Sequence, residues 1–309
     1  MRGDPAAELR EPEMKTFLIK IALSFVTVAA VASQSASAQT DVKQAEAKMF
    51  AASAGYERFM GRWSRVLAPK FIAFAGVKNG DRVLDVGTGT GSVASTVEAS
   101  MPASEIVGID PSPGFIAHAQ KNAKSARARF EVGDAQAMKF KDASFDRTLS
   151  LLVMNFIPDH NKAIAEMRRV TRAQGVVSAC VWDYDAGMQM LRFFWDEAIA
   201  LDPAIEPKDE RHMKLSRQGQ LGELWRKAGL VNVKEAPLVI DQQYSSFNDY
   251  WESFKTGAGP GGAYVVSLSE DRRQQLESRM RKRLLGDRED GQFTLTARTW
   301  CVLGDVPKT

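Results

Sequence analysis

The sequence predicts an α/β fold with a doubly wound, mostly parallel sheet whose two faces are covered by helices. Between residues 82 and 182, short apolar runs alternate with segments of helical periodicity. Alternating strands and helices pack as a parallel sheet with right-handed crossovers. The chain has 309 residues, of which 44% are hydrophobic and 26% are charged, as in a folded globular protein. This length predicts one large domain with appendages, because single cores stop growing at roughly 250 to 300 residues.

The first segment, residues 1–38, has the pattern of a secretory signal peptide or an anchor. Two lysines precede an apolar run at residues 21–32, and the small residues ASA end at Ala38, a suitable cleavage point. The apolar run is shorter than the roughly 20 residues that span a membrane. We therefore expect cleavage and no stable membrane span afterwards, with Met14 as the start of translation.

Residues 41–78 are expected to form N-terminal helices, because their apolar residues recur at spacings of three and four. The sheet follows. Strands are predicted at 82–86, 105–109, 128–132, 147–152 and 176–182, and helices near 91–100, 113–125 and 162–171.

The last part of the chain, residues 185–309, is expected to complete the sheet and to add a helical cap. Residues 202–229 look mostly helical, two more strands are predicted at 231–244 and 293–303, and a strong helix is predicted at 270–285. The cap segments are rich in aromatic residues, namely Phe193, Phe194, Trp195, Tyr250, Trp251, Phe254 and Tyr264. Each is interpreted as packing in the cap, and as a group they indicate an apolar or aromatic small-molecule pocket. The glycine-rich residues 257–262 are interpreted as a mobile lid hinge or a disordered loop.

The chemistry is predicted at the end of the first strand, in the segment VLDVGTGTG at residues 83–91. In a doubly wound sheet, ligands bind at the carboxyl ends of the strands. Glycines there let the backbone turn sharply and approach a ligand closely. A dinucleotide fingerprint needs G-x-G-x-x-G, whereas the glycines here are Gly87, Gly89 and Gly91, and Ser92 stands at the third position. This spacing disfavours a nicotinamide-dependent oxidoreductase.

An acidic residue lies at the end of each of three successive strands. Asp85 would repel a pyrophosphate but suits a cationic amino acid group or a ribose. Asp110 can accept hydrogen bonds from both ribose hydroxyls, and Asp134 can accept one from an exocyclic amine such as that of adenine. Together the three acids predict a site for a nucleoside with an uncharged linker.

Five segments resemble, in order, the motifs of class I S-adenosylmethionine-dependent methyltransferases of the ubiquinone/menaquinone-biosynthesis-like (methyltransferase type 11) group. They are VLDVGTGTG, VGIDPSPGFIAHAQ, FEVGDAQAMKF, FDRTLSLLVMNFIPD and AIAEMRRVTRAQGVVSACVWDY. The resemblance covers about residues 48–304 and includes a helix before the core at 56–72. It implies a Rossmann-like methyltransferase fold of seven strands, the last one antiparallel and inserted beside the fifth. It also implies S-adenosyl-L-methionine as the cofactor, bound by a core at residues 79–184.

The resemblance implies cofactor contacts at ten positions. The methionine and ribose side would be lined by Asp85, Gly87, Gly89 and Gly91, the ribose hydroxyls held by Asp110, and the adenine bordered by Pro111, Asp134 and Ala135. Tyr56 and Trp63 would close over the cofactor, with plain core packing as the alternative. Cys180 and Cys301 would lie on neighbouring strands, and we expect two buried thiols there, with pairing as the alternative in an oxidising compartment.

No catalytic residue follows from the resemblance, because methyl transfer mainly needs alignment and requires a base only when the acceptor atom carries a proton. Candidates near the mouth of the site are Asn155, Phe156, Asp159, His160, Trp182, Asp183, Tyr184 and His212, and His118 is a weaker one. Two cysteines and three histidines without ligand spacing predict no metal.

The expected function is methyl transfer from S-adenosyl-L-methionine to a small, apolar or aromatic molecule. The alternative is an exported nucleoside-binding module without methyl transfer. The net charge of +3 and a single short basic run at 279–283 predict no nucleic-acid partner. The signal peptide indicates a periplasmic or secreted protein, whereas the supply of cofactor indicates the cytoplasm.

Overall fold

The computed structural model describes residues 53–308. The segment predicted as a signal peptide or anchor, residues 1–38, lies outside the described residues, as does the first part of the predicted N-terminal helices. Within residues 53–308, no helix is long and apolar enough to cross a membrane.

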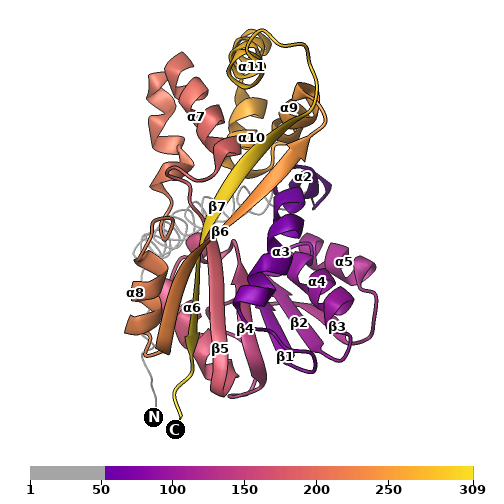
Figure 1. Cartoon of the computed structure of the whole chain (residues 1–309), viewed down its shortest axis with the longest axis vertical. Coiled ribbons are helices and arrows are strands. Elements are labelled where there is room, and N and C mark those ends of the chain that lie inside the picture. The colour runs from indigo at the N-terminus through magenta and orange to yellow at the C-terminus, as the bar shows by residue number, and fades with distance from the viewer. Residues whose placement is uncertain (1–52, 309) are drawn as a thin grey trace, which may run out of the picture. The chain divides into compact units, whose positions relative to one another are not determined.

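A seven-stranded sheet lies at the centre of the fold, in the order β3-β2-β1-β4-β5-β7-β6 (Figure 1). The strands are β1 (Arg82–Val86), β2 (Glu105–Asp110), β3 (Ala128–Val132), β4 (Phe145–Leu151), β5 (Thr171–Trp182), β6 (Val231–Tyr244) and β7 (Phe293–Asp305). Strands β1 to β5 pair in parallel, and β7 is antiparallel to both β5 and β6. These pairings confirm the predicted doubly wound, mostly parallel sheet with its last strand inserted beside the fifth.

Helices cover both faces of the sheet (Figure 1). One face carries α3 (Arg62–Phe74), α4 (Ser92–Ser100) and α5 (Pro113–Asn122), and the other carries α6 (His160–Val170) and α8 (Gln220–Lys227). Because the central strands are covered twice, β1 is apolar at Val83, Leu84 and Val86, and all three side chains are buried. Helix α3 is preceded by α2 (Ser53–Tyr56) and a π-helical turn, η1 (Glu57–Gly61).

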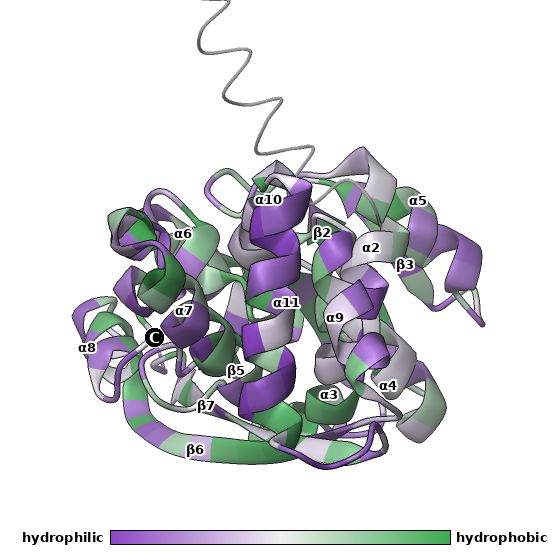
Figure 2. Ribbon diagram, turned by 90° about the horizontal axis from the view of Figure 1, so that it is seen from above, coloured by the Kyte–Doolittle hydropathy of each residue, from purple (hydrophilic) through white to green (hydrophobic). Residues whose placement is uncertain are grey.

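The cap consists of α7 (Gln189–Leu201), α9 (Phe247–Lys255), α10 (Gly259–Ser267) and α11 (Glu270–Leu285), gathered around the far ends of β6 and β7 (Figure 1). Its aromatic rings pack on one another: Phe194 stacks on Phe254 with ring centroids 4.4 Å apart and meets Trp195 edge to face. The outer face of α11 is hydrophilic (Figure 2), whereas Leu276 and Met280 are buried. The packing role expected for the single aromatic residues is therefore confirmed.

One expectation for the cap is wrong. Residues 257–262 do not form a loose hinge, because helix α10 begins at Gly259 and Gly261 packs within 3.1 Å of the Phe254 ring, measured from an added Cβ. Residues 202–229 are mostly helical, as predicted, although not as one continuous α-helix. Two short 3-10 helices, η3 (Pro203–Lys208) and η4 (Glu210–His212), precede α8, because prolines interrupt this stretch and aspartate side chains cap both turns.

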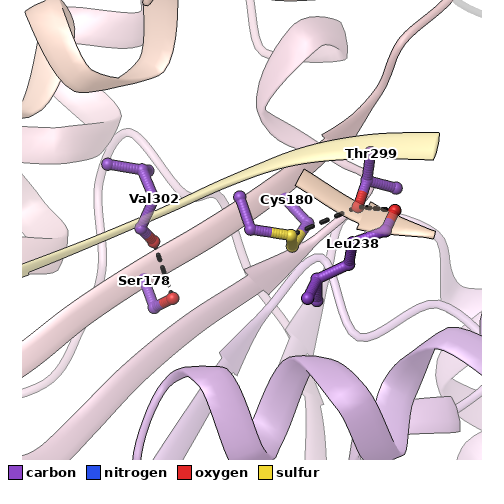
Figure 3. Close-up of a disulfide and its surroundings, with 6 residues drawn as sticks. Ser178, Cys180, Leu238, Thr299 and Val302 are labelled. Atoms are coloured by element: carbon purple, nitrogen blue, oxygen red, sulfur yellow. Dashed lines mark hydrogen bonds between the residues drawn. A yellow bond between two sulfur atoms is a disulfide. The ribbon is translucent and has the colours of Figure 1, made fainter. Parts of the chain in front are cut away.

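Cys180 and Cys301 form a disulfide, which overturns the expectation of two free thiols (Figure 3). The antiparallel register of β5 and β7 places them directly opposite each other, with Cα atoms 4.1 Å apart. Both are fully buried, and the Thr299 hydroxyl lies 3.3 Å from the Cys301 sulfur. The register of the two strands determines this pairing, and the spacing of the two cysteines along the sequence does not reveal it.

Candidate active site

The loop after β1 is held against β2 and β4. The backbone N–H groups of Gly87 and Thr88 donate to the Ile109 carbonyl at 2.8 and 2.9 Å. Gly87 has a φ of +73°, and a Cβ at this position would lie 2.4 Å from Cγ1 of Val153, which follows β4. Only glycine satisfies both the backbone conformation and this close approach.

Asp85 is buried at the end of β1, with 1% of its surface exposed. Its Oδ2 accepts a hydrogen bond of 2.7 Å from the Thr88 hydroxyl, while its Oδ1 has no partner among the described residues. Burial raises the pKa of Asp85 to about 7; the Thr88 bond opposes this shift and the nearby Asp110 charge adds to it. An unpartnered buried carboxylate oxygen is costly, so this position suits a ligand that brings a donor or a positive charge.

Asp110, at the end of β2, ties the glycine loop to the neighbouring strand. Its Oδ2 accepts from the Gly89 N–H at 3.0 Å, and its Oδ1 accepts from the Ser112 N–H at 2.9 Å. Burial raises the pKa of Asp110, and these two bonds oppose the shift. Each carboxylate oxygen has a second lone pair, which leaves Asp110 able to accept a ligand hydroxyl as well.

A small polar cavity joins the glycine loop to the N-terminal helices. It is lined by Tyr56, Ser64, Asp85, Gly87, Thr88, Gly89, Thr90, Ser92, Val93 and Leu151. Tyr56 thus reaches this cavity, and its ring lies 5.2 Å from that of Phe115. Trp63 does not line it: its side chain is fully buried, donates to the Tyr244 hydroxyl at 3.2 Å and meets the Trp182 ring edge to face. The structure therefore places the two aromatic candidates in different surroundings. Gly91 lies at the start of α4, with a φ of +91°.

Asp134, the third of the predicted acids, follows the edge strand β3 at the same end of the sheet. The Gly133 N–H, just after β3, donates to the Asp110 carbonyl at 3.1 Å, which brings the ends of β2 and β3 together. Asp134 and Pro111 are exposed there and Ala135 is half-buried. The Asp134 Oδ1 accepts from the Gln136 N–H at 2.8 Å. All three strand ends that carry acids therefore border one region.

Glu57 is a site residue that the sequence pattern does not reveal. It lies on the π-helical turn η1, where its carboxylate accepts from the Thr90 hydroxyl of the glycine loop and pairs with Arg65. Single π-helical turns often mark functional sites. Only the packing of the N-terminal helices against the loop, which the sequence does not specify, brings Glu57 there.

Several of the candidates near the predicted mouth of the site lie after the ends of β4 and β5. Asn155 and Tyr184 are 8% and 3% exposed. Burial raises the pKa of Tyr184 well above its ordinary value, the charge of Glu210 adds to this shift, and the Asn155 amide opposes it. Trp182 is also buried, and its Nε1 has no partner among residues 53–308. Glu210 of η4 was not a candidate in the sequence.

The remaining candidates are placed differently. Asp159 caps α6 by accepting from the Lys162 N–H at 3.0 Å, and Asp183 pairs with Arg298. His212 is exposed and lies 2.8 Å from Glu206. Other positions are as follows: Phe156 is exposed, His118 is half-buried within α5, and His160 begins α6. The buried Nε2 of His160 has no partner within residues 53–308, and the pKa of this residue is lowered chiefly by burial.

Sequence relatives cover the central part of the chain. Residues 84–179 match the family described as "Methyltransferase domain". An uncharacterized protein of Mycobacterium tuberculosis is 34% identical over 120 residues, 38% of this chain and 42% of its own length. A ubiquinone/menaquinone biosynthesis C-methyltransferase of a Geobacter species is 38% identical over 122 residues, 38% of this chain and 50% of its own length. The chain thus spans about two fifths to one half of the length of these relatives.

Solved structures share the fold over most of the chain. The YcgJ protein of Bacillus subtilis has a TM-score of 0.53 at 18% identity, covering 78% of this chain and 98% of that protein. A phosphoethanolamine N-methyltransferase of Haemonchus contortus, solved with S-adenosylhomocysteine and phosphomonomethylethanolamine, has a TM-score of 0.52 at 20% identity, covering 83% and 57%.

The sheet order is that of the Rossmann-like methyltransferase fold that these solved structures share. Residues 84–179 match a methyltransferase domain, and about two fifths of the chain is similar to a ubiquinone/menaquinone biosynthesis C-methyltransferase.

Proposed function

We propose that this protein binds S-adenosyl-L-methionine at the glycine loop and transfers its methyl group to a small molecule. The observation that carries the proposal is Asp85, a buried carboxylate with one unpartnered oxygen in the cavity under the glycine loop. A second carboxylate, Asp110, is fixed beside it by the loop itself. One buried acid in the cavity and a second one beside it favour a cationic ligand, and S-adenosyl-L-methionine carries positive charge on both its sulfonium and its ammonium group.

The chain's own residues suit the parts of this cofactor. Asp85 and Glu57 can accept from the ammonium group, and Asp110 from the ribose hydroxyls. Gly89 leaves room for the ligand beside the backbone, because no atom lies within 4 Å of a Cβ built there. Gly87 and Gly91 shape the same loop, where a Cβ would meet Val153 and Ala119. Pro111, Asp134 and Ala135 border the adenine in this proposal, and Tyr56 covers the cavity. In this proposal Trp63 does not line the cavity and instead packs against the Trp182 ring.

When bound, S-adenosyl-L-methionine supplies an electrophilic methyl group on a positively charged sulfur. The protein's part is to align the acceptor and to exclude water, and positioning alone can supply much of the rate. Residues 41–78 then provide the cover, residues 79–184 the cofactor-binding core, and residues 185–309 the rest of the sheet and the cap. We propose a small apolar or aromatic acceptor, because the Tyr56 ring lines the cavity and lies 5.2 Å from the Phe115 ring.

Calorimetric titration of S-adenosylhomocysteine into the full chain tests the cofactor. We expect micromolar binding that Asp110→Ala weakens by roughly 10- to 150-fold, as for a lost charge-assisted hydrogen bond of about 1.5–3 kcal/mol. The matched control is Asp142→Ala, an exposed aspartate paired with Arg169 away from the cavity. Binding equal in both variants would contradict the assigned site.

Methyl transfer is tested separately, with the full chain, methyl-labelled S-adenosyl-L-methionine and an extract of small molecules. Label that enters the extract only with the unmodified protein supports the enzyme. Tight S-adenosylhomocysteine binding without transferred label would instead favour the nucleoside-binding module.

A further inference from the structure

Strand β3 presents an unpaired backbone edge. It lies at one end of the sheet order, and within residues 53–308 it pairs with β2 alone (Figure 1). Its last residue, Val132, is an apolar side chain that is 54% exposed. The free edge of a sheet offers a row of N–H and carbonyl groups to which another strand can pair. The edge of β3 is therefore a surface that a further strand can extend.

The hydrogen bonds at both ends of β3 show which of its residues face outward. The Arg127 carbonyl accepts from the Ile106 N–H at 2.9 Å, and the Gly133 N–H donates to the Asp110 carbonyl at 3.1 Å. The odd-numbered residues of this segment therefore direct their backbone groups to β2. Because these groups alternate along a parallel pair, the even-numbered residues 128, 130 and 132 direct theirs away from the sheet.

The side chains of Arg129 and Glu131 lie on the same face of the sheet, opposite Phe130, because they are two residues apart in a strand. Both line an open groove of about 360 Å³. Arg129 pairs with Glu105 only loosely, at 3.9 Å, and the two side chains are 67% and 55% exposed. An exposed pair of this kind contributes little to stability, so Arg129 is available to another acid.

We propose that β3 pairs antiparallel with β3 of a second copy of this chain, about a twofold axis at Phe130, so that two sheets become one. The N–H groups of Phe130 and Val132 in each copy donate to the carbonyls of Phe130 and Ala128 in the other. Arg129 of each copy then lies opposite Glu131 of the other, in the closely spaced type of antiparallel pair. Val132 of each copy is covered by Ala128 of the other.

The charges select this register. Moving one strand by two residues keeps the outward backbone groups opposite each other, but Arg129 then faces Arg129, or Glu131 faces Glu131. Like charges directly opposite each other are destabilising. Moving it by one residue sets outward groups against inward ones. The Gln120 side chain of α5 donates to the Phe130 carbonyl at 2.9 Å, and the second lone pair of this oxygen serves the second copy.

Sedimentation equilibrium of the full chain, from roughly 1 µM to 1 mM, tests the proposal. We expect a monomer at the low end and a dimer at the high end, because a five-residue strand makes a small and hence transient interface. Arg129→Glu and Glu131→Arg should each weaken dimerisation at least tenfold, since each variant sets like charges opposite each other at both symmetry-related pairs.

Mixing the two variants is the decisive arm. In an equimolar mixture, the acidic strand of Arg129→Glu faces the basic strand of Glu131→Arg, and every opposed pair is again of unlike charge. Association should therefore return to about the level of the unmodified protein. The double variant, which exchanges the two charges within one chain, should also dimerise.

Two control variants match the charge changes away from β3. Arg217→Glu removes a guanidinium that is 63% exposed and lies 3.9 Å from Asp185, much as Arg129 lies from Glu105. Glu223→Arg changes a 62% exposed glutamate of α8 that pairs with Lys227. Both should dimerise like the unmodified protein. Thermal denaturation of every variant shows whether it is folded, without relying on any ligand.

A chain that stays monomeric over the whole range would overturn the proposal, and the charges of β3 would then only protect its edge from pairing. A dimer that tolerates either reversal on β3, or a mixture of the two variants that does not recover, would place the interface on another surface.

Discussion

Cys180 of β5 lies directly across from Cys301 of β7, and their sulfur atoms are bonded in the interior of the sheet. The bridge closes a loop with a sequence separation of 121 residues. A disulfide stabilises mainly by restricting the unfolded chain, and more so for long loops. The bridge therefore joins the cofactor-binding core to the last strand of the sheet.

Replacing both cysteines, as Cys180→Ala with Cys301→Ala, should lower the free energy of unfolding by on the order of 3–5 kcal/mol. Urea denaturation of the oxidised protein and the double variant measures this difference. Because both residues are fully buried, a reductant should act on the native protein only slowly. Equal denaturation midpoints with and without the bridge would contradict the prediction.

Gly87→Ala should abolish detectable binding of S-adenosylhomocysteine and destabilise the fold by roughly 2–4 kcal/mol, because the added methyl group meets Val153 at 2.4 Å. Adding Val153→Ala should restore part of the stability, while the strain of a positive φ, about 1 kcal/mol, remains. Thermal denaturation and calorimetric titration check both variants. No recovery in the double variant would show that the clash is not the cause.

The affinity for S-adenosylhomocysteine should rise with pH until about pH 7 and then level off. Asp85 has a pKa of about 7 in the free protein, and only its ionised form pairs with the ligand ammonium group. Below that pH, affinity should fall by up to about tenfold per pH unit. Asp85→Asn should bind more weakly and lack this dependence; a variant that keeps the same pH profile would assign the titration to another group.

Glu210→Gln should make the protein more stable above neutral pH. An unfolded glutamate loses its proton near 4.5, whereas native Glu210 loses it near 7, so the native state holds more protons between these values. Stability attributable to this group therefore decreases as the pH rises from about 4.5 to 7. We expect a gain of up to about 3 kcal/mol near pH 8 and little change near pH 4, measured by urea denaturation. A gain that is the same at both pH values would contradict this account.

Arg192→Ala should destabilise the protein by about 3–5 kcal/mol, because it leaves the fully buried Asp209 carboxylate without its bidentate partner. Arg211→Ala is the matched control, since Arg211 also pairs with Asp209 but is 35% exposed. That variant should cost about 1 kcal/mol or less. Similar losses of stability in the two variants would show that the burial of the arginine does not determine the effect.

The sheet was largely predictable from the sequence because its strands are short apolar runs separated by helices. The predicted bounds of β1, β3 and β6 agree with the structure, and β2, β4, β5 and β7 differ from theirs only at their ends. The start of β5 was missed, because Thr171–Gln174 is polar and partly exposed, and reads as loop.

The site was predictable where it is local in sequence and was missed where it depends on tertiary packing. Asp85 and the glycines of its loop share one turn, so their proximity follows from the chain itself. Glu57 reaches the glycine loop from a distant element, and its approach depends on how the N-terminal helices pack. The Cys180 bridge likewise depends on strand register.

The two long strands β6 and β7 run without interruption from the sheet into the cap (Figure 1). They stay paired from Lys234 with Leu303, inside the sheet, to Tyr244 with Phe293, beside the cap helices. A cap built on a continuous two-stranded ribbon cannot swing as a separate body without breaking backbone hydrogen bonds. Access to the buried groups therefore depends on the short helices α2 and η1, which are tied to the core by the bond from Thr90 to Glu57 and by the ring contact of Tyr56 with Phe115.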